Sequence, residues 1–252
     1  MSTFADHHVV VSGGGTGVGA AIASAFAKAG ARVTILGRRQ SSLDAVAKTS
    51  GALALACDVT NRETVDRALD KARAVNGATS IAIANAGAAS SAPFAKMKPS
   101  DLNAMLDVNL NGVFNLWQAC LPDLKSRASG RLIAIASTAG LKGYAYVSGY
   151  CAAKHGVIGL TRAVALELAD SGITANAICP GFVDTPLLNR SVENIVSKTG
   201  LSDAEARQSL VQNNPQGRFI EVDEVADTAL WLAGDGARSV NGQAISVNGG
   251  EV

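Results

Sequence analysis

The sequence predicts an α/β fold, in which a doubly wound parallel sheet carries helices on both of its faces. Apolar runs of strand length alternate with longer segments of helical periodicity along almost the whole chain. The strand-length runs are apolar on both faces, as parallel strands covered from both sides are. At 252 residues, with no repeat, low-complexity tract or Pro/Ser-rich linker, the chain fits a single domain.

The expected strands are recognised by their short apolar content. The first is a β-branched run that leads into a glycine-rich turn, and each later run lies between two longer segments. In chain order the strands are expected at residues 7–12, 32–36, 52–57, 81–84, 131–137, 174–179 and 244–247.

The expected helices repeat apolar residues three and four positions apart. They are expected at residues 17–29, 41–49, 61–75, 101–124, 149–169 and 222–232. Right-handed crossovers between parallel strands place such helices on both faces of the sheet, so residues 1–252 are expected to form one Rossmann-like domain.

Residues 186–215 interrupt this alternation. The segment is long, polar and weakly periodic, and it follows the end of an expected strand, where sheets of this kind bind ligands. We interpret it as a substrate-loop excursion. It is either a mobile lid or a helical excursion on the surface.

Composition favours small molecules as partners. Lysine and arginine number 22 and acidic residues 21, which leaves a net charge of +1 without a basic stripe for nucleic acid or a basic amphipathic helix for a membrane surface. The polar N-terminus predicts neither a signal peptide nor a membrane span, and scattered cysteines predict buried free thiols, so a cytoplasmic location is expected. The cysteines are Cys57, Cys120, Cys151 and Cys179.

A glycine-rich turn follows the first expected strand and begins the first expected helix. Its glycines have the spacing Gly-x3-Gly-x-Gly, which allows the backbone and the helix N-terminus to approach a pyrophosphate. A plain strand-to-helix turn is the alternative. The cofactor-binding residues expected here are Gly13, Thr16, Gly17, Val18 and Gly19.

The second expected strand ends beside Arg38 and Arg39, where an NAD-binding site usually has a carboxylate for the ribose 2′-hydroxyl. A guanidinium group can bind a 2′-phosphate through two hydrogen bonds. We therefore predict that NADP(H) is preferred and that NAD(H) remains possible. The alternative is a solvated pair of charges at a helix start.

Tyr150 and Lys154 are four residues apart on an expected helix, so their side chains share a face. A phenol with an ordinary pKa of about 10 is a poor base at neutral pH, and a nearby ammonium lowers that pKa. We expect Lys154 to act in this way, with Tyr150 as proton-transferring acid/base and Ser137 binding the substrate oxygen. Packing and a turn-forming serine are the structural alternatives.

Tyr150-x3-Lys154, with Ser137 thirteen residues upstream and the glycine turn, resembles the short-chain dehydrogenase/reductase family over essentially the whole chain. The resemblance implies that Asn109 is catalytic and holds a water linked to Lys154, which also contacts the nicotinamide ribose. It implies further cofactor-binding residues, which include Tyr150 itself. These are Asp58, Val59, Asn85, Ala86, Gly87, Tyr150, Lys154, Pro180, Gly181, Val183 and Thr185.

The chain departs from the family pattern at three positions. Ser12 replaces a frequent threonine and Val18 an isoleucine, which keeps a hydroxyl and an apolar contact. Ala84 replaces the first of two frequent asparagines, and its hydrogen-bonding role must be filled elsewhere.

The expected substrate wall is mainly apolar and favours an acyl chain or ring over a sugar. It comprises Ser137, Tyr144, Tyr150, Phe182, Leu187 and Leu188, although the apolar members could instead seal the loop against the core. Residues 150–188, 214–218 and 247–250 resemble reductases of β-ketoacyl thioesters, including acetoacetyl-CoA reductases and polyketide ketoreductases. This resemblance implies reversible reduction of a 3-oxoacyl thioester.

Several alternatives stay open at this point. A dehydrogenase of 3-hydroxybutyrate, a steroid or a cyclic alcohol would use the same catalytic residues, and a non-catalytic nucleotide sensor could use the same fold. A hydrolase is disfavoured because no G-x-S-x-G motif is present. No metal is expected, because His7, His8 and His155 lack ligand spacing. By resemblance, the chain forms a homotetramer through the helices that carry Asn109 and Tyr150.

Overall fold

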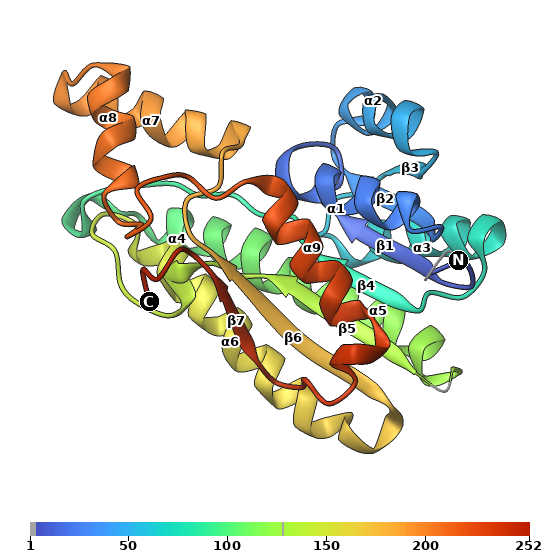
Figure 1. Ribbon diagram of the computed structural model, residues 1–252. Helices are drawn as coiled ribbons and strands as arrows, with labels where there is room; N and C mark the ends of the chain where they lie inside the picture. The colour runs from blue at the N-terminus through green and yellow to red at the C-terminus, as the bar shows by residue number, and fades with distance from the viewer. Residues whose placement is uncertain (1–3, 128) are drawn as a thin grey trace.

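Seven parallel strands form one sheet in the computed structural model, which describes residues 4–127 and 129–252 (Figure 1). Residues 1–3 lie outside the described residues. They belong to the polar N-terminus, where no signal peptide was expected. The strands are β1 His8–Ser12, β2 Arg32–Gly37, β3 Leu53–Ala56, β4 Ile81–Ala84, β5 Gly130–Ile135, β6 Ile173–Pro180 and β7 Ala244–Val247.

The strand order is β3-β2-β1-β4-β5-β6-β7. The chain proceeds outward from β1 to β3, then crosses back so that β4 pairs with the other side of β1, where Val9 is opposite Ile81. The order therefore reverses between β1 and β4. Ligands of open α/β sheets bind beyond the carboxyl ends of the strands at such a reversal.

Helices cover both faces of the sheet (Figure 1). On one face α1 Gly17–Lys28, α2 Gln40–Ser50 and α9 Val222–Ala233 pack on side chains such as Val9 and Ile35. On the other face α3 Arg62–Asn76, α5 Gly112–Lys125 and α6 Ser148–Glu167 pack on Val10 and Leu36. Alternate residues of each strand thus enter opposite cores, which confirms the predicted doubly wound sheet.

The segment 101–124 was expected to be one helix, and the chain is helical from Pro99 to Lys125 with one irregular turn. The structure has α4 Pro99–Leu106, a π-helical turn Asp107–Asn111 and then α5. In the turn, the backbone N–H of Gly112 donates to the carbonyl of Asp107, five residues earlier. One extra residue in a turn leaves the apolar pattern nearly unchanged, so periodicity did not reveal it.

The strand expected at 131–137 also ends earlier, because β5 stops at Ile135. Ser137 has extended backbone and begins the 3-10 turn Thr138–Gly140, where its hydroxyl accepts a hydrogen bond from the N–H of Ala139. Ser137 therefore lies just beyond the carboxyl end of the sheet.

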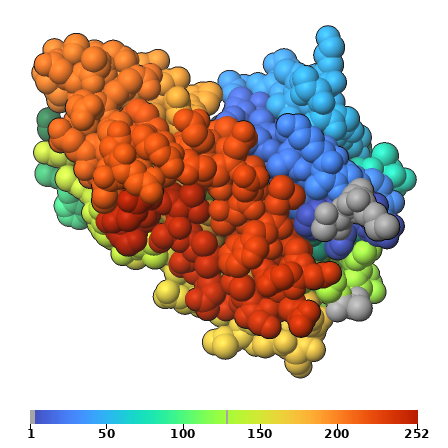
Figure 2. Space-filling model, in the orientation of Figure 1, coloured from blue at the N-terminus to red at the C-terminus, as the bar shows by residue number. Residues whose placement is uncertain are grey.

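The excursion after β6 is helical. Thr185 caps α7 Pro186–Thr199, Ser202 caps α8 Asp203–Val211, and Leu188, Val192 and Ala206 form a small core between them. Both helices project from the body of the molecule (Figure 1), and Figure 2 shows the surface hollowed between this projection and α1 with α2. Of the two alternatives, the helical excursion describes the structure, and its movement as a lid stays a prediction.

No helix among the described residues has the length and apolar character needed to cross a membrane.

Candidate active site

The glycine-rich turn connects β1 to α1 through backbone conformations that favour glycine. Gly13 has φ 66° and Gly17 has φ 54°. A Cβ on Gly19 would lie 2.3 Å from the carbonyl oxygen of Gly13, so a side chain there would separate the turn from the helix.

The start of α1 is free to receive an anion. Thr16 is the N-cap residue, but its side chain makes no capping hydrogen bond, and the first turn contains no acidic residue. The N–H groups at the helix start therefore lack a side-chain acceptor, as expected where a pyrophosphate binds.

Ser12 and Asn85 hold this turn against the end of β4. The Asn85 side-chain amide donates to the carbonyls of Ser12 at 3.0 Å and Gly13 at 3.1 Å. The Ser12 hydroxyl accepts from the N–H groups of Asn85 at 3.0 Å and Ala86 at 3.1 Å. These hydrogen bonds join the turn to the end of β4, where Ala84 replaces an asparagine. Gly87 follows at the edge of the site.

The loop after β6 lies against the same turn. A Cβ on Gly17 would be 3.1 Å from the Thr185 methyl group, so the two segments are in contact. Beyond Pro180, Gly181 donates to the carbonyl of Val247 at 3.0 Å, and Val183 forms a parallel bridge with Ile220. The structure therefore brings together two sets of expected cofactor residues that are far apart in sequence.

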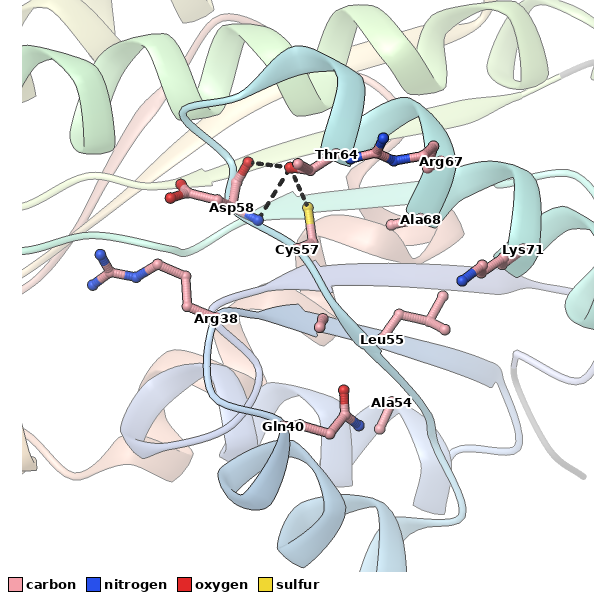
Figure 3. A pocket seen from close by; sticks show the side chains of 11 residues that line it. Arg38, Gln40, Ala54, Leu55, Cys57, Asp58, Thr64, Arg67, Ala68 and Lys71 are labelled. Carbon is pink, nitrogen blue, oxygen red and sulfur yellow. Dashed lines mark hydrogen bonds between the residues drawn. The ribbon is translucent and has the colours of Figure 1, made fainter.

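A cavity of about 620 Å³ opens beside the carboxyl ends of β2 and β3 (Figure 3). Arg38 and Asp58 lie at one end of it, and Arg67 and Lys71 of α3 line it farther along. Among the described residues, Arg38 has no ion-pair partner, while Asp58 accepts hydrogen bonds from the backbone and hydroxyl of Thr60.

Two residues beside this cavity have different surroundings. Arg39 is exposed at the N-cap position of α2, where its side chain makes no capping hydrogen bond. Val59 is buried, and a Cβ on Gly112 would lie 2.7 Å from its side chain, so Val59 packs against the start of α5. An exposed, unpaired Arg38 fits a 2′-phosphate better than it fits a bare ribose hydroxyl.

Tyr150, Lys154 and Ser137 converge beyond the end of β5. Tyr150 and Lys154 lie on α6, and the Lys154 Nζ is 5.6 Å from the centre of the Tyr150 ring. The same Nζ donates to the carbonyl of Ile135 at 2.7 Å, and a hydrogen bond joins Tyr150 to Ser137. The three side chains that were expected to act together are therefore adjacent.

The expected lowering of the Tyr150 pKa by Lys154 is wrong. Burial raises the pKa of Tyr150 to about 12, and the hydrogen bond with Ser137 opposes this only partly. Burial lowers the pKa of Lys154 to about 8. Desolvation disfavours both charged forms and is the largest cause of both shifts.

Asn109 lies in the π-helical turn and is fully buried. Its amide donates to the carbonyls of Ala88 at 2.9 Å and Met105 at 3.0 Å, and its oxygen accepts from the N–H of Ala88 at 3.2 Å. A Cβ on Gly87 would lie 2.8 Å from this oxygen and 3.8 Å from the Lys154 Nζ. Asn109 is thus placed close to Lys154, and the π turn, a feature often found at functional sites, places it there.

The expected substrate wall is partly assembled. The Tyr144 and Phe182 rings meet edge to face, with centroids 6.2 Å apart. Leu187 is partly buried, whereas Leu188 is only 3% exposed and packs inside the core of α7 and α8. Tyr144 and Phe182 are therefore in mutual contact, and Leu188 serves the excursion itself.

Sequence reasoning missed the side chains around Tyr144. Glu251 and Thr138 contact its hydroxyl, and Lys142 lies over its ring. Glu251 is 107 positions from Tyr144, and no local pattern connects them. The contact between Glu251 and Tyr144 forms only when the chain is folded.

The remaining titratable side chains form no obvious second centre. The four cysteines are free and buried. His8 bonds to Gly77 and Thr34, and His155 bonds to the carbonyl of Cys151, so these histidines serve local structure. Within the described ranges, no group of three or more His, Cys, Asp or Glu side chains could hold a metal ion.

Comparisons with known proteins agree with this geometry. Residues 13–251 match the family model described as enoyl-(acyl carrier protein) reductase. The chain is 34% identical to a D-beta-hydroxybutyrate dehydrogenase of Cupriavidus necator over 249 residues, with 96% of each chain covered. It is 34% identical to an acetoacetyl-CoA reductase of Shinella zoogloeoides over 244 residues, covering 96% of this chain and 97% of the relative.

Solved structures show the same likeness. A variant of actinorhodin polyketide ketoreductase with NADPH matches with a TM-score of 0.95 and 32% identity, covering 100% of this chain and 99% of that one. Levodione reductase matches with a TM-score of 0.93 and 30% identity, covering 98% of both chains.

Proposed function

Because the chain belongs to the short-chain dehydrogenase/reductase family, we propose that it is an NADP(H)-preferring oxidoreductase that reduces 3-oxoacyl thioesters to 3-hydroxyacyl thioesters. NAD(H) is the alternative cofactor in this proposal. The observation that carries the proposal is the convergence of Ser137, Tyr150 and Lys154 beyond β5. We propose that one domain, residues 1–252, contains the whole site.

The reaction requires a hydride at the carbonyl carbon and a proton at the carbonyl oxygen. Bound NADPH supplies the hydride, so that 3-oxoacyl thioester, NADPH and one proton give 3-hydroxyacyl thioester and NADP⁺. The raised pKa of Tyr150 keeps its phenol protonated at neutral pH, ready to donate to the oxygen. The Ser137 hydroxyl donates a second hydrogen bond, which orients the carbonyl.

Lys154 and Asn109 support the proton transfer. After donation, the phenolate at Tyr150 is stabilised by the ammonium of Lys154, which would also hold the cofactor ribose. Asn109 lies beside Lys154 and would order a water through which the proton is replaced. Gly13, Thr16, Gly17, Val18 and Gly19 would hold the pyrophosphate, while Arg38 would bind the 2′-phosphate.

The oxidation of 3-hydroxybutyrate is a second candidate function. It is supported by the likeness to D-beta-hydroxybutyrate dehydrogenases of Cupriavidus necator and Rhizobium meliloti, both 34% identical over 249 residues. The same catalytic groups serve both reactions, and the substrates differ at the carboxyl carbon, which is a charged carboxylate in the free acid and a neutral thioester in the other.

A spectrophotometric screen with NADPH and NADH separates these functions. We expect acetoacetyl-CoA to be reduced with a higher kcat/KM than acetoacetate, and NADPH to be used better than NADH. A higher kcat/KM for acetoacetate would favour the second candidate. No oxidation of either cofactor by thioesters, free 3-oxo acids or cyclic ketones would favour a nucleotide sensor.

We also propose a cytoplasmic homotetramer. Phe114 on α5 and Leu166 on α6 are exposed apolar side chains on helices that would pack against copies of themselves. Light scattering coupled to size-exclusion chromatography tests the assembly, and a monomeric mass would contradict it.

A further inference from the structure

A buried carboxylate lies behind the expected substrate wall. The side chain of Glu251, the penultimate residue, is 1% exposed. Its backbone N–H donates to the Asn248 side chain at 3.2 Å, which ties the end of the chain to the segment after β7. A buried carboxylate is costly unless it is paired, so its partners indicate what it does.

The partners of Glu251 come from the segment between Ser137 and Tyr150. The Tyr144 hydroxyl donates to Glu251 Oε1, and the Lys142 ammonium lies 3.1 Å from the same oxygen. Lys142 also lies over the Tyr144 ring, 5.0 Å from its centre. The carboxylate therefore fixes an aromatic ring and a cation together.

This cluster contacts both sides of the proposed substrate wall. The Tyr144 hydroxyl is 2.7 Å from the Thr138 hydroxyl, next to Ser137 in the chain. The Tyr144 ring meets Phe182, and Glu251 Oε2 is 3.3 Å from where a Cβ on Gly181 would be. Glu251 thus lies between the loop after β5 and the loop after β6.

Charge decides what such a wall can accept. A free 3-oxo acid has a carboxylate that needs a cation in a partly dehydrated site, whereas a thioester or ester has none. Lys142 is the cation beside the Tyr144 ring of this wall, and its ion pair with Glu251 occupies it. Without that pair, the ammonium would be available to a substrate carboxylate.

We infer that Glu251 determines the charge selectivity of the site: it neutralises Lys142 and holds Tyr144, so that uncharged 3-oxoacyl groups are accepted and free 3-oxo acids are disfavoured. The inference rests on the proposed function and narrows it to uncharged acyl substrates. It assigns Glu251 a positioning role, with no proton transfer of its own.

The test compares acetoacetate with ethyl acetoacetate, which have the same ketone and differ in charge. Both turnover with NADPH and binding in the presence of NADP⁺, measured by calorimetry, are determined for wild type and Glu251→Gln. Glutamine keeps an oxygen that accepts from Tyr144 while it frees Lys142. We expect acetoacetate to gain about tenfold relative to the ester, as a newly available ion pair would provide.

Two further variants make the result specific. Glu251→Gln combined with Lys142→Gln is expected to lose the gain, because the freed cation is then absent. Glu167→Gln, an exposed change at the far end of α6, is expected to leave the wild-type ratio unchanged. Thermal unfolding establishes that each variant is folded.

The inference would be overturned if Glu251→Gln bound acetoacetate no better, relative to ethyl acetoacetate, than wild type does. It would also be overturned if this relative gain persisted in the double variant that lacks Lys142. If neither the ester nor acetoacetyl-CoA is reduced by wild type, the proposed function fails instead. In that case the ratio of the calorimetric affinities for acetoacetate and ethyl acetoacetate still tests the role of Glu251.

Discussion

The Lys154 ammonium lies 5.6 Å from the centre of the Tyr150 ring, and it donates its 2.7 Å hydrogen bond to the Ile135 carbonyl. The phenol and the ammonium that was expected to lower its pKa are thus adjacent but not directly hydrogen-bonded. Burial raises the pKa of the phenol and lowers that of the amine. The phenol therefore carries its proton at neutral pH, which is the protonation state that carbonyl reduction needs.

Removal of the phenol hydroxyl tests its role. In Tyr150→Phe we expect kcat to fall by about 10²–10⁴-fold, the usual contribution of a general acid. The NADPH dissociation constant, measured by fluorescence titration, should change little because the ring is retained. Retention of more than a tenth of the wild-type kcat would show that another group donates the proton.

The buried amine predicts a pH-dependent stability. Lys154 has a pKa of about 8 in the folded chain and a reference value of 10.5. Between these values the unfolded chain binds more protons, so the contribution of Lys154 to stability rises with pH and is smallest below about pH 8.

We therefore expect wild type to gain about 2–3 kcal/mol in unfolding free energy, relative to Lys154→Met, between about pH 8 and about pH 10. Urea unfolding across this range measures the difference. Lys48→Met, at an exposed position of α2, supplies the control. Parallel pH profiles for wild type and Lys154→Met would contradict the lowered pKa.

We expect cofactor choice to depend on Arg38. In Arg38→Asp we expect KM for NADPH to rise by about 10–100-fold and KM for NADH to change much less, because a bidentate phosphate contact is replaced by repulsion. Arg67→Asp makes the same charge change farther along the cavity and should have a smaller effect. Equal losses for both cofactors in Arg38→Asp would mean that Arg38 does not contact the phosphate.

Tyr146 is the only described residue other than glycine with a positive φ, at 67°. Tyr146 is 66% exposed, and its carbonyl accepts from the N–H of Ala92 at 2.8 Å. Asparagine tolerates this conformation better than tyrosine, so Tyr146→Asn should stabilise the fold by about 0.5–1 kcal/mol. Tyr146→Ala keeps the backbone strain and serves as the control. Equal stability of the two variants in urea would refute the strain.

Much of the architecture could be predicted from local features. Strands apolar on both faces require helices on both sides, and the glycine spacing after β1 reflects positive φ angles that L side chains rarely adopt. Tyr150 and Lys154 share a helix face because of their spacing alone. The family resemblance added Asn109 and the loop after β6, which no local rule would have selected.

The tertiary structure alone decided the helix irregularity, the pKa values of the catalytic pair and the contact of Glu251 with Tyr144. The π turn that directs Asn109 to Ala88 and Met105 adds one residue to a helix without altering its apolar pattern. The pKa values of Tyr150 and Lys154 follow from desolvation, which depends on what covers the side chains.

The contact of Glu251 with Tyr144 joins residues 107 positions apart. Sequence by itself determined what backbone geometry and periodicity impose on neighbouring residues. Burial, charge pairing and contacts between distant segments arise only when the whole chain packs, because each depends on neighbours that local sequence does not specify.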